Sequence, residues 1–593
     1  MDMGGRTLTT TDALGRVTRT AADKLNRTMV VTDARAGQTS FTYDANSNLL
    51  SLVDALNHST SYTYDTSDRV ATRTDPLNHA ASYQYDLNGN ATQTTDRKNQ
   101  VTSSTYDALD RLSQVTFNDS STIANTYDAG DRVTQIVDSS NVTITRTYDN
   151  LDRLTQETTP QGTVGYTYDA ASRRATMTVA GQTAVNYSYD NANHLTSVTQ
   201  GTSSVTITYD NAGRRSTLTY PNGIVATYGY DAANELTSLS YALGGTTVGN
   251  LTYTYDLGGN RTGVGGSWAR TGLPSAVTSA TYDAANRIAG WAGTSFSYDL
   301  NGNLTSDGTN TYSWNARDQL TAMSGGTAAN FSYDGVRRRR SKTISGATAS
   351  FLYDGLNFVQ ELSSGGTPTA NLLTGLGIDE TFTRTDSGGT SALLVDALGS
   401  TLELADASGA LQTHYAYEPF GVTTVSGAAS TNTLQFTGRE FDTMGMYYFR
   451  TRFYSTTRQR FAAEDPLGQR GGVNLYSYVN NRPTIFIDPL GLEGAQGGFS
   501  IWANYIWNTV VDAAATAGSG LANVAAGVGV ELMEGVHTIE DALDLGLAGA
   551  KVAKEHHQAW EDACAQLGLT CAPPDPNKPP DQKKSKSDDN HGK

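Results

Sequence analysis

Short runs in which apolar and polar residues alternate cover most of the first 430 residues of the chain. Segments such as 61–64 (Ser-Tyr-Thr-Tyr) and 165–168 (Gly-Tyr-Thr-Tyr) have the period of two that is typical of a half-buried β-strand. Turn-forming residues separate these runs, for instance at 86–90 (Asp-Leu-Asn-Gly-Asn), where Gly and Asn tolerate a positive φ. The pattern therefore predicts a chain of two-stranded β-hairpins.

A Tyr-Asp pair marks each predicted hairpin, first at a nearly constant interval and then at looser spacing. The pairs begin at Tyr43, Tyr64, Tyr85, Tyr106, Tyr127, Tyr148, Tyr168, Tyr189, Tyr209, Tyr230, Tyr255, Tyr282, Tyr298, Tyr333 and Tyr353. An aspartate that recurs so regularly is more typical of a turn cap than of a catalytic group, and we interpret the tyrosine as an anchor. Because a lone hairpin is marginally stable, we expect the hairpins to pair edge to edge into one long antiparallel sheet, which strand twist would coil.

Composition supports a β-rich protein. Of the 593 residues only 17% are charged, and Thr, Ser, Asn and Tyr supply the polarity that suits strands and turns. The net charge of −17 argues against general binding of nucleic acid or anionic membranes by the repeats. One basic run, Arg337–Arg340, is interpreted as a solvated strand or turn within the repeats.

The ends and the cysteines add three expectations. No apolar run follows Met1, so no N-terminal signal peptide is predicted, and the start within a repeat suggests a fragment or a short family member. Cys564 and Cys571 provide no disulfide framework and lack metal spacing, although a small disulfide-closed loop stays open as an alternative. No cofactor or metal site is predicted.

The later segments carry motifs that are far more specific than any single Tyr-Asp pair. They are Tyr417–Gly421 (Tyr-Glu-Pro-Phe-Gly), Phe436–Glu440, Tyr447–Tyr454, Asn474–Pro483 and Asp488–Leu492 (Asp-Pro-Leu-Gly-Leu). With these motifs the chain resembles the YD-repeat, or Rhs, family from about Thr11 to Leu492. The resemblance implies that the repeats wind into a hollow β-shell, that a core domain closes one end, and that a variable C-terminal segment, often a toxin, is held inside. A scaffold of this length is short for a complete shell, so closure would require upstream sequence or a partner.

The predicted fold is therefore mainly β, with a small α-helical domain at the C-terminus. We expect the YD-repeat shell over residues 1–380 and the Rhs repeat-associated core domain over 381–492. A helical variable domain is expected over 493–572, and the Pro-, Lys- and Asp-rich tail 573–593 is expected to be disordered.

Two aspartates near the end of the core domain are candidates for chemistry. Asp465 and Asp488 lie on separate turns and can meet only if the segment Asn474–Pro483 folds back. Two adjacent carboxylates share one proton and can act as general base and general acid on water. By resemblance they match the family's aspartyl-protease dyad, and Arg452 matches a basic residue of the same site.

The scissile bond that the resemblance implies is Leu492–Glu493, which a single-turnover cleavage in cis would break. The alternative is structural, because Asp-Pro-Leu-Gly is an ordinary turn sequence and residues 75–78 (Asp-Pro-Leu-Asn) are a near copy within the repeats.

After Leu492 the composition changes, since Tyr-Asp pairs cease and Ala and Gly increase. Residues 499–511 have helical spacing, and 532–547 have an amphipathic apolar stripe. Between them, residues 513–530 carry no charge and are interpreted as a buried helical hairpin, with membrane contact by 499–530 after release as the alternative.

The leading functional hypothesis is a toxin or effector scaffold that encapsulates its own C-terminal segment and releases it by cleavage after Leu492. It implies secretion or delivery to target cells in competition between bacteria, with an immunity protein and a secretion-system component as partners. A second hypothesis is a surface adhesion protein whose Tyr-rich sheet binds glycans or other cells. In a third, the C-terminal domain is a hydrolase toxin in which His556 or His557 acts as the base.

Overall fold

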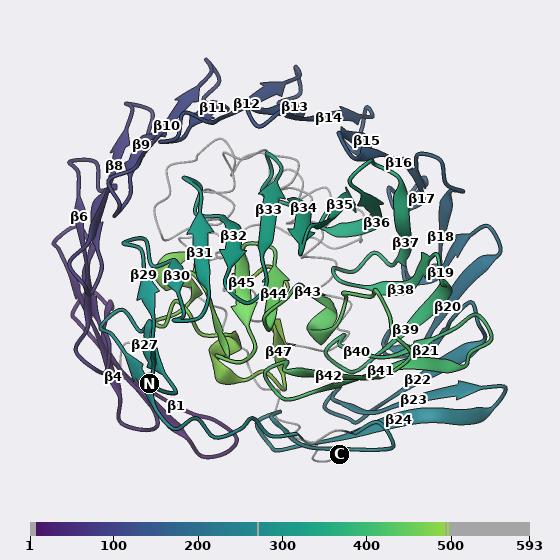
Figure 1. The fold of residues 1–593 in the computed structure, drawn as a ribbon. Coiled ribbons are helices and arrows are strands. Elements are labelled where there is room, and N and C mark those ends of the chain that lie inside the picture. The colour runs from purple at the N-terminus through teal and green to yellow at the C-terminus, as the bar shows by residue number, and fades with distance from the viewer. Residues whose placement is uncertain (1–7, 270–271, 493–494, 497–593) are drawn as a thin grey trace, which may run out of the picture. The chain divides into compact units, whose positions relative to one another are not determined.

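The computed structural model describes residues 8–269, 272–492 and 495–496, all within one compact unit, Met1–Val528. Most of these residues form two large antiparallel sheets (Figure 1). The first sheet contains β1 (Thr9–Thr11), β2 (Val17–Ala22), β3 (Thr28–Thr32), β4 (Gln38–Tyr43), β5 (Leu49–Val53), β6 (Ser59–Tyr64), β7 (Val70–Thr74), β8 (Ala80–Tyr85), β9 (Ala91–Thr95), β10 (Val101–Tyr106), β11 (Leu112–Thr116), β12 (Thr122–Tyr127), β13 (Val133–Asp138), β14 (Val142–Tyr148), β15 (Leu154–Thr159), β16 (Gly162–Tyr168), β17 (Arg174–Val179), β18 (Val185–Tyr189), β19 (Leu195–Gln200), β20 (Ser203–Tyr209), β21 (Arg215–Thr219), β22 (Ile224–Tyr230), β23 (Leu236–Leu243), β24 (Thr246–Tyr255) and β25 (Arg261–Gly265).

The second large sheet begins after a three-stranded sheet. That small sheet contains β26 (Ala280–Tyr282), β27 (Ile288–Trp291) and β28 (Thr294–Ser295). The second large sheet contains β29 (Ser297–Tyr298), β30 (Leu304–Ser306), β31 (Thr311–Trp314), β32 (Leu320–Ser324), β33 (Ala329–Tyr333), β34 (Arg339–Ile344), β35 (Ala347–Asp354), β36 (Asn357–Ser363), β37 (Pro368–Thr374), β38 (Thr381–Asp386), β39 (Gly389–Val395), β40 (Thr401–Ala405), β41 (Leu411–Tyr417) and β42 (Thr423–Gly427).

The last described segment is built from short elements. A four-stranded sheet contains β43 (Glu440–Phe441), β44 (Met446–Phe449), β45 (Arg452–Ser455) and β46 (Arg460–Phe461), and β47 (Phe486–Ile487) pairs with β48 (Ala495–Gln496). Within the described ranges the helices are short 3-10 turns: η1 (Phe436–Gly438), η2 (Gly468–Gly471) and η3 (Val479–Asn481).

The predicted mainly β architecture is confirmed, and within each large sheet every strand pairs with the next one along the chain, as in β6 with β7 and β7 with β8. The second sheet continues across residue 380, because β37 pairs with β38. The expected helical domain 493–572 and tail 573–593 lie outside the described residues. Among the residues that are described, no helix has the length and apolar character needed to span a bilayer.

The aspartate of each Tyr-Asp pair from Tyr43 to Tyr333 caps the turn that follows it, as predicted, whereas Asp354 accepts a hydrogen bond from the Tyr166 hydroxyl and pairs with Arg174. In one repeat, Asp107 Oδ1 accepts hydrogen bonds from the backbone N–H groups of Leu109 (2.9 Å) and Arg111 (3.1 Å). The residue between them, Asp110, has a φ of 60°. An Asx turn that ends in a left-handed residue explains why Asn, Asp, Ser and Gly recur at this position, since these residues adopt a positive φ at least cost.

Where an arginine closes the turn, it connects one repeat to the next. Arg111 Nε donates to Asp107 Oδ2 at 2.7 Å, and its Nη1 reaches the carbonyl of Asp128 in the following repeat at 3.3 Å. The guanidinium lies 4.5 Å from the ring centre of Tyr127, whose hydroxyl donates to the carbonyl of Leu112 at 2.9 Å. Tyr64, Tyr85, Tyr106 and Tyr148 make the same hydroxyl contact, so these tyrosines are anchors on the preceding hairpin, which confirms the interpretation of the Tyr-Asp pair.

The first turns at the opposite edge of the first sheet, from Asp12 to Asp96, are also capped by aspartates, which the Tyr-Asp pattern did not predict. Asp54 Oδ1 accepts hydrogen bonds from the N–H groups of Leu56 (2.8 Å) and His58 (2.9 Å). Asp75 does the same for Leu77 and His79, at 2.9 Å in both cases. A second capped turn therefore recurs in these repeats, at the edge that faces the catalytic candidates described below.

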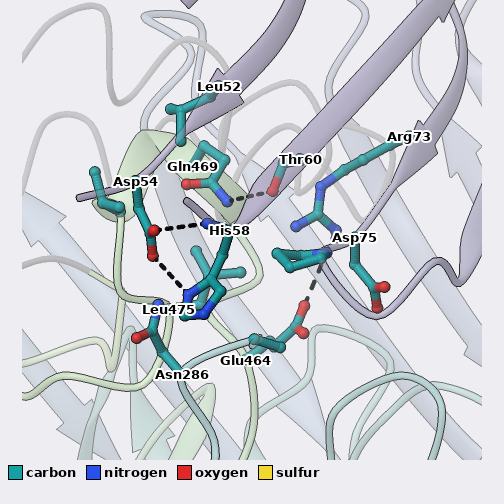
Figure 2. A pocket seen from close by; sticks show the side chains of 13 residues that line it. Leu52, Asp54, His58, Thr60, Arg73, Asp75, Asn286, Glu464, Gln469 and Leu475 are labelled. Atoms are coloured by element: carbon teal, nitrogen blue, oxygen red, sulfur yellow. Dashed lines mark hydrogen bonds and ion pairs between the residues drawn. The ribbon is translucent and has the colours of Figure 1, made fainter. Parts of the chain in front are cut away.

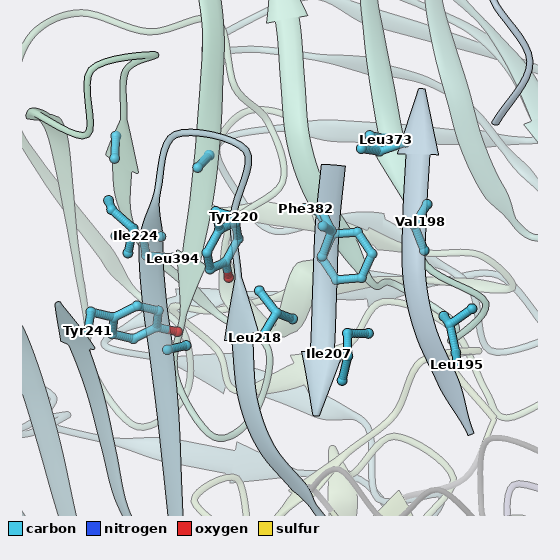
Figure 3. Close-up of a cluster of buried hydrophobic side chains, with 14 of the residues drawn as sticks. Leu195, Val198, Ile207, Leu218, Tyr220, Ile224, Tyr241, Leu373, Phe382 and Leu394 are labelled. Atoms are coloured by element: carbon cyan, nitrogen blue, oxygen red, sulfur yellow. The ribbon is translucent and has the colours of Figure 1, made fainter. Parts of the chain in front are cut away.

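An apolar core joins the two large sheets. Leu195 and Val198 on β19, Ile207 on β20 and Leu218 on β21 form one buried cluster with side chains of the second sheet (Figure 3). The second sheet contributes Leu373, Phe382 and Leu394, among others. Hydrogen bonds reinforce this contact, because the hydroxyls of Tyr220 and Tyr241 donate to the carbonyls of Leu393 (3.0 Å) and Val395 (2.7 Å).

The run Arg337–Arg340 is not the solvated strand or turn expected from the sequence. Arg338 and Arg339 are only 8% and 0% exposed. Arg338 Nη1 lies 2.8 Å from a carboxylate oxygen of Glu157 in the first sheet, and Arg339 pairs with Glu440 and Asp442. The expectation was wrong because the acidic partners lie far away along the chain.

Asp307, in the turn between β30 and β31, anchors the second sheet to the segment after β45. Burial alone raises the pKa of Asp307, but hydrogen bonds from the Tyr312 hydroxyl (2.6 Å) and the Asn310 N–H (2.7 Å), together with the Arg458 guanidinium, lower it to about 2. The side chain is therefore stabilised as the carboxylate.

We predict that Asp307→Asn lowers the free energy of unfolding by about 1–2 kcal/mol at pH 7, after allowance for solvent screening. The folded-state pKa of about 2 lies below the ordinary value of 3.8. The stabilisation is therefore complete above about pH 4 and is lost as the pH falls toward 2. Denaturant unfolding of wild type and variant between pH 2.5 and 7 checks this, with the exposed turn variant Asp119→Asn as a control that changes little. An equal loss at every pH would contradict it.

Candidate active site

Arg452 is the first residue of β45 and lies at the centre of the candidate site. Its Nη2 atom is 2.9 Å from Asp465 Oδ2 and 3.4 Å from Asp488 Oδ2. Because both carboxylate oxygens contact the same nitrogen atom, the two acids converge on one guanidinium. The structure thus brings together Asp465, Asp488 and Arg452, the three residues predicted from the sequence.

The segment between the two aspartates folds back, as their convergence requires. The Asp465 N–H donates to the carbonyl of Leu475 at 2.9 Å, and the same carbonyl accepts a hydrogen bond from Arg452 Nη1 at 3.0 Å. The Leu467 N–H in turn donates to Asp465 Oδ1 at 2.9 Å. Asp465 therefore caps its own turn with one carboxylate oxygen and faces Arg452 with the other.

The site is closed off from solvent. Asp465, Asp488 and Arg452 are 6%, 2% and 3% exposed. Burial lowers the pKa of Arg452 below its ordinary value, although Asp465 and Asp488 oppose this effect. One guanidinium faces two carboxylates, so the buried group has an excess negative charge that a single shared proton would remove.

Aromatic side chains surround this buried charge. The Arg452 guanidinium carbon lies 3.6 Å from the ring centre of Phe461, a stacked contact that leaves the edge of the guanidinium free for carboxylates. Phe461 belongs to a buried aromatic cluster with Tyr447, Phe449, Tyr454 and Tyr478. Burial, and next the charge of Asp488, raise the pKa of Tyr478, so this hydroxyl stays protonated.

Side chains of Thr451 and Arg452 hold the backbone of the residues before the predicted scissile bond. Thr451 Oγ1 lies 2.6 Å from the Leu490 carbonyl oxygen and 2.8 Å from that of Gly491 and shares its one hydrogen between them, and Arg452 Nε also donates to Gly491. The Leu492 N–H donates to Asp488 Oδ1 at 2.9 Å. The peptide groups on the N-terminal side of Leu492 are therefore fixed beside the two aspartates.

Gly491 is required for this path. It has a φ of 69°, and a Cβ at this position would lie 2.4 Å from the Phe449 carbonyl oxygen. Beyond it, Ile487 pairs with Ala495 in the β47–β48 ladder, so the chain reverses direction between these residues. Glu493, on the other side of the predicted scissile bond, lies outside the described residues, as do His556, His557, Cys564, Cys571 and the segment 499–530.

A small pocket lies beside the Asp465 turn (Figure 2). Asp54 and His58 from the repeats line it together with Glu464 and Gln469 from the core segment, residues 436–492. The Asp54–His58 pair, with 3.0 Å between carboxylate and ring nitrogen, fixes the turn to which both belong. In the part of the chain that the structure describes, no three His, Cys, Asp or Glu side chains are grouped to hold a metal ion.

The fold and site define a YD-repeat β-sheet protein with two buried aspartates at the end of its repeats. The family model of the teneurin YD-shell matches residues 14–120, 112–245 and 225–465. These matches cover more than half of the chain, so the chain belongs to the YD-shell family, and the resemblance drawn from its motifs is confirmed.

Two bacterial proteins are similar to parts of this chain. The chain is 30% identical over 255 residues to the tRNA3(Ser)-specific nuclease WapA of Bacillus spizizenii, in a match that covers 41% of this chain and 11% of that protein. It is 27% identical over 266 residues to the double-stranded DNA deaminase toxin A of Burkholderia cenocepacia, which covers 37% of this chain and 19% of that protein. The chain thus spans a fifth or less of the length of these relatives.

A solved structure has the same fold. The crystal structure of TcdB2-TccC3-TEV matches 83% of this chain and 34% of its own chain, with a TM-score of 0.62 and 16% sequence identity. At this identity the likeness concerns the fold alone.

We predict that Arg452→Met destabilises the protein by about 3–5 kcal/mol at pH 7, because it leaves two buried carboxylates without their cation. The loss should shrink as the pH falls and the carboxylates bind protons. Denaturant unfolding at pH 7 and pH 5 measures both effects. The surface variant Arg16→Met, whose side chain is 56% exposed, is the matched control and should change stability by less than about 0.5 kcal/mol. A loss as small as that of the control would show that Arg452 does not stabilise the pair.

Proposed function

We propose that this protein cleaves its own chain between Leu492 and Glu493 with Asp465 and Asp488 as an aspartyl-protease dyad. The observation that supports this most is the shared contact of both carboxylates with Arg452 Nη2, at 2.9 and 3.4 Å, beside the immobilised carbonyls of Leu490 and Gly491. Arg339 also faces two buried acids, Glu440 and Asp442. The Arg452 group differs in its place beside the predicted scissile bond, where Arg452 donates to the Gly491 carbonyl and Asp488 accepts from the Leu492 N–H.

In the proposed step one aspartate is ionised and the other holds the shared proton. The carboxylate takes a proton from a water molecule while the water oxygen bonds to the Leu492 carbonyl carbon, and the protonated aspartate stabilises the oxygen that becomes negative. The C–N bond then breaks as the oxyanion re-forms the carbonyl, the first aspartate passes the proton taken from water to the Glu493 nitrogen, and the water oxygen stays in the Leu492 carboxyl group. Because catalyst and substrate are held on one chain, a single turnover needs no encounter in solution.

We further propose that the released segment, residues 493–593, is a toxin or effector for which the repeats serve as a scaffold and container. Several relatives that match this chain carry toxin names, including toxin protein Tse5 of Pseudomonas aeruginosa and toxin subunit YenC1 of Yersinia entomophaga. These names favour a toxin scaffold over a surface adhesion protein. An immunity protein, a secretion-system component and delivery to target cells belong to the same proposal.

Purified wild-type protein should run as two fragments, a large one of residues 1–492 and a small one of residues 493–593, in place of the intact chain of 63.1 kDa. The small fragment should begin at Glu493 by N-terminal sequencing. Asp465→Asn and Asp488→Asn should each give a single intact band, while the turn variant Asp283→Asn should be cut like wild type. An intact wild-type band, indistinguishable from Asp488→Asn, would remove the protease proposal.

Expression of residues 493–593 alone should arrest bacterial growth when it is directed to the compartment in which the cargo acts. Plating efficiency after induction, in the cytosol and with a periplasmic leader, measures this outcome. The full-length Asp488→Asn protein is the matched control and should be less toxic, since it keeps the segment attached. Normal growth in both compartments would count against a toxic cargo.

A further inference from the structure

The residue before Asp465 makes an ion pair with a distant repeat. Glu464 Oε1 and Oε2 accept hydrogen bonds from Arg97 Nη1 (2.9 Å) and Nη2 (2.8 Å), a two-pronged contact between residues 367 positions apart. Arg97 lies in the capped turn between β9 and β10. The two side chains are 8% and 10% exposed, so the pair is shielded from solvent.

Arg97 is itself held in place by the neighbouring turn. Its Nη1 lies 2.9 Å from Asp75 Oδ2, and its Nη2 donates to the carbonyl of Asn301 at 2.5 Å. Burial lowers the pKa of Arg97, but Glu464 and Asp75 together raise it above its ordinary value. The guanidinium therefore joins two turns of the first sheet, one turn of the second sheet and the core segment.

The loop that carries Asp465 has little freedom once Glu464 is fixed. Gly471 packs against Asp465, since a Cβ on this glycine would lie 2.6 Å from Asp465 Oδ2. Gln469 Nε2 donates to Thr60 Oγ1 on β6 at 3.3 Å, a second contact between this loop and the repeats (Figure 2). Glu464 and Gln469 thus flank Asp465 and both bind to the first sheet.

We propose that the Arg97–Glu464 ion pair is a positioning latch, which places the Asp465 turn beside Arg452 and Asp488 only after the β9–β10 hairpin has folded and docked. This inference rests on the self-cleavage proposed above and adds its regulation. Neither Arg97 nor Glu464 touches the reacting atoms; they act through the position of Asp465. Cleavage then reports that residues 60–97 and the core segment have assembled, and an unassembled chain keeps its C-terminal segment attached.

Hydrogen exchange in an uncleaved background tests the latch without relying on catalysis. Asp488→Asn supplies that background, and Arg97→Ala is added to it. The amides of Asp465 and Gly468, which donate to the carbonyls of Leu475 and Asp465, should exchange at least tenfold faster. The β9–β10 and β44–β45 amides should be unchanged.

The matched control is Lys98→Ala, in the same turn. Lys98 pairs with Asp299 (3.2 Å) and Asp318 (3.1 Å) of the second sheet, so its removal should leave the Asp465 loop protected. If Arg97→Ala fails to fold, Glu464→Gln provides the second variant, because it keeps the shape of the side chain and leaves Arg97 paired with Asp75. Unchanged exchange in the Asp465 loop of a folded Arg97 or Glu464 variant would overturn the latch.

Pulse-chase in a cell-free translation of the full chain then measures the rate at which the small fragment appears. Arg97→Ala and Glu464→Gln should slow cleavage at least tenfold, the double variant should be no slower than the worse single variant, and Arg97→Lys should be intermediate. Lys98→Ala should cleave at the wild-type rate. If the wild-type chain never cleaves, the protease proposal is refuted, and the hydrogen-exchange result alone decides on the latch. If Arg97→Ala cleaves at the wild-type rate, only the latch is refuted.

Discussion

The turn aspartate, with its two backbone hydrogen bonds, is the interaction on which the rest of the molecule depends. An isolated hairpin of this length is marginally stable in water, and few residues of strands β2 to β9 are fully buried. The aspartate fixes the turn between two strands. An arginine at the end of such a turn then binds the aspartate, the backbone of the next turn and the ring of the next tyrosine. Stability is therefore assembled from nearest-neighbour contacts, as in other repeat proteins, and the apolar core is needed chiefly where the second sheet packs on the first.

The core segment follows a different rule. Here burial is nearly complete, and the stabilising contacts join residues far apart in the chain: Arg339 with Glu440 and Asp442, Arg439 with Asp379, and Arg97 with Glu464. Buried ion pairs contribute modest net stability but penalise any arrangement that leaves one partner unpaired. They therefore select one geometry for the segment that contains Asp465 and Asp488, which is what a reaction with little tolerance for misplacement requires.

The local pattern of the sequence was sufficient for the hairpins, since the Tyr-Asp turns are stabilised by groups close to them in the chain. Arg452, Asp465 and Asp488 were singled out by resemblance to the family's motifs, and the structure brings these three side chains together. The local pattern was insufficient wherever a charged side chain has a distant partner. Arg338 and Arg339 were expected in solvent because Glu157, Glu440 and Asp442 lie far away in the chain, and only Asp334 pairs with Arg338 locally. Arg97 could have been suspected, because the equivalent turn residues are Ala55 and Pro76 in the two preceding repeats and a buried cation at such a position needs an acid. The second set of capping aspartates, Asp54 and Asp75 among them, was visible in the spacing but hidden by the stronger Tyr-Asp signal.

The regular hairpin spacing also bears on how such a chain can change its length during evolution. Where a repeat touches only the repeats beside it, a whole hairpin can be duplicated or deleted and the two flanking units rejoin with the same Arg and Tyr contacts. The hairpin that contains Arg97 cannot be duplicated or deleted in this way, because Arg97 must bind Glu464 and Asn301, which lie at fixed positions. We therefore expect insertions and losses of hairpins among relatives to accumulate upstream of residue 60, while the number of hairpins between Arg97 and Glu464 stays nearly constant.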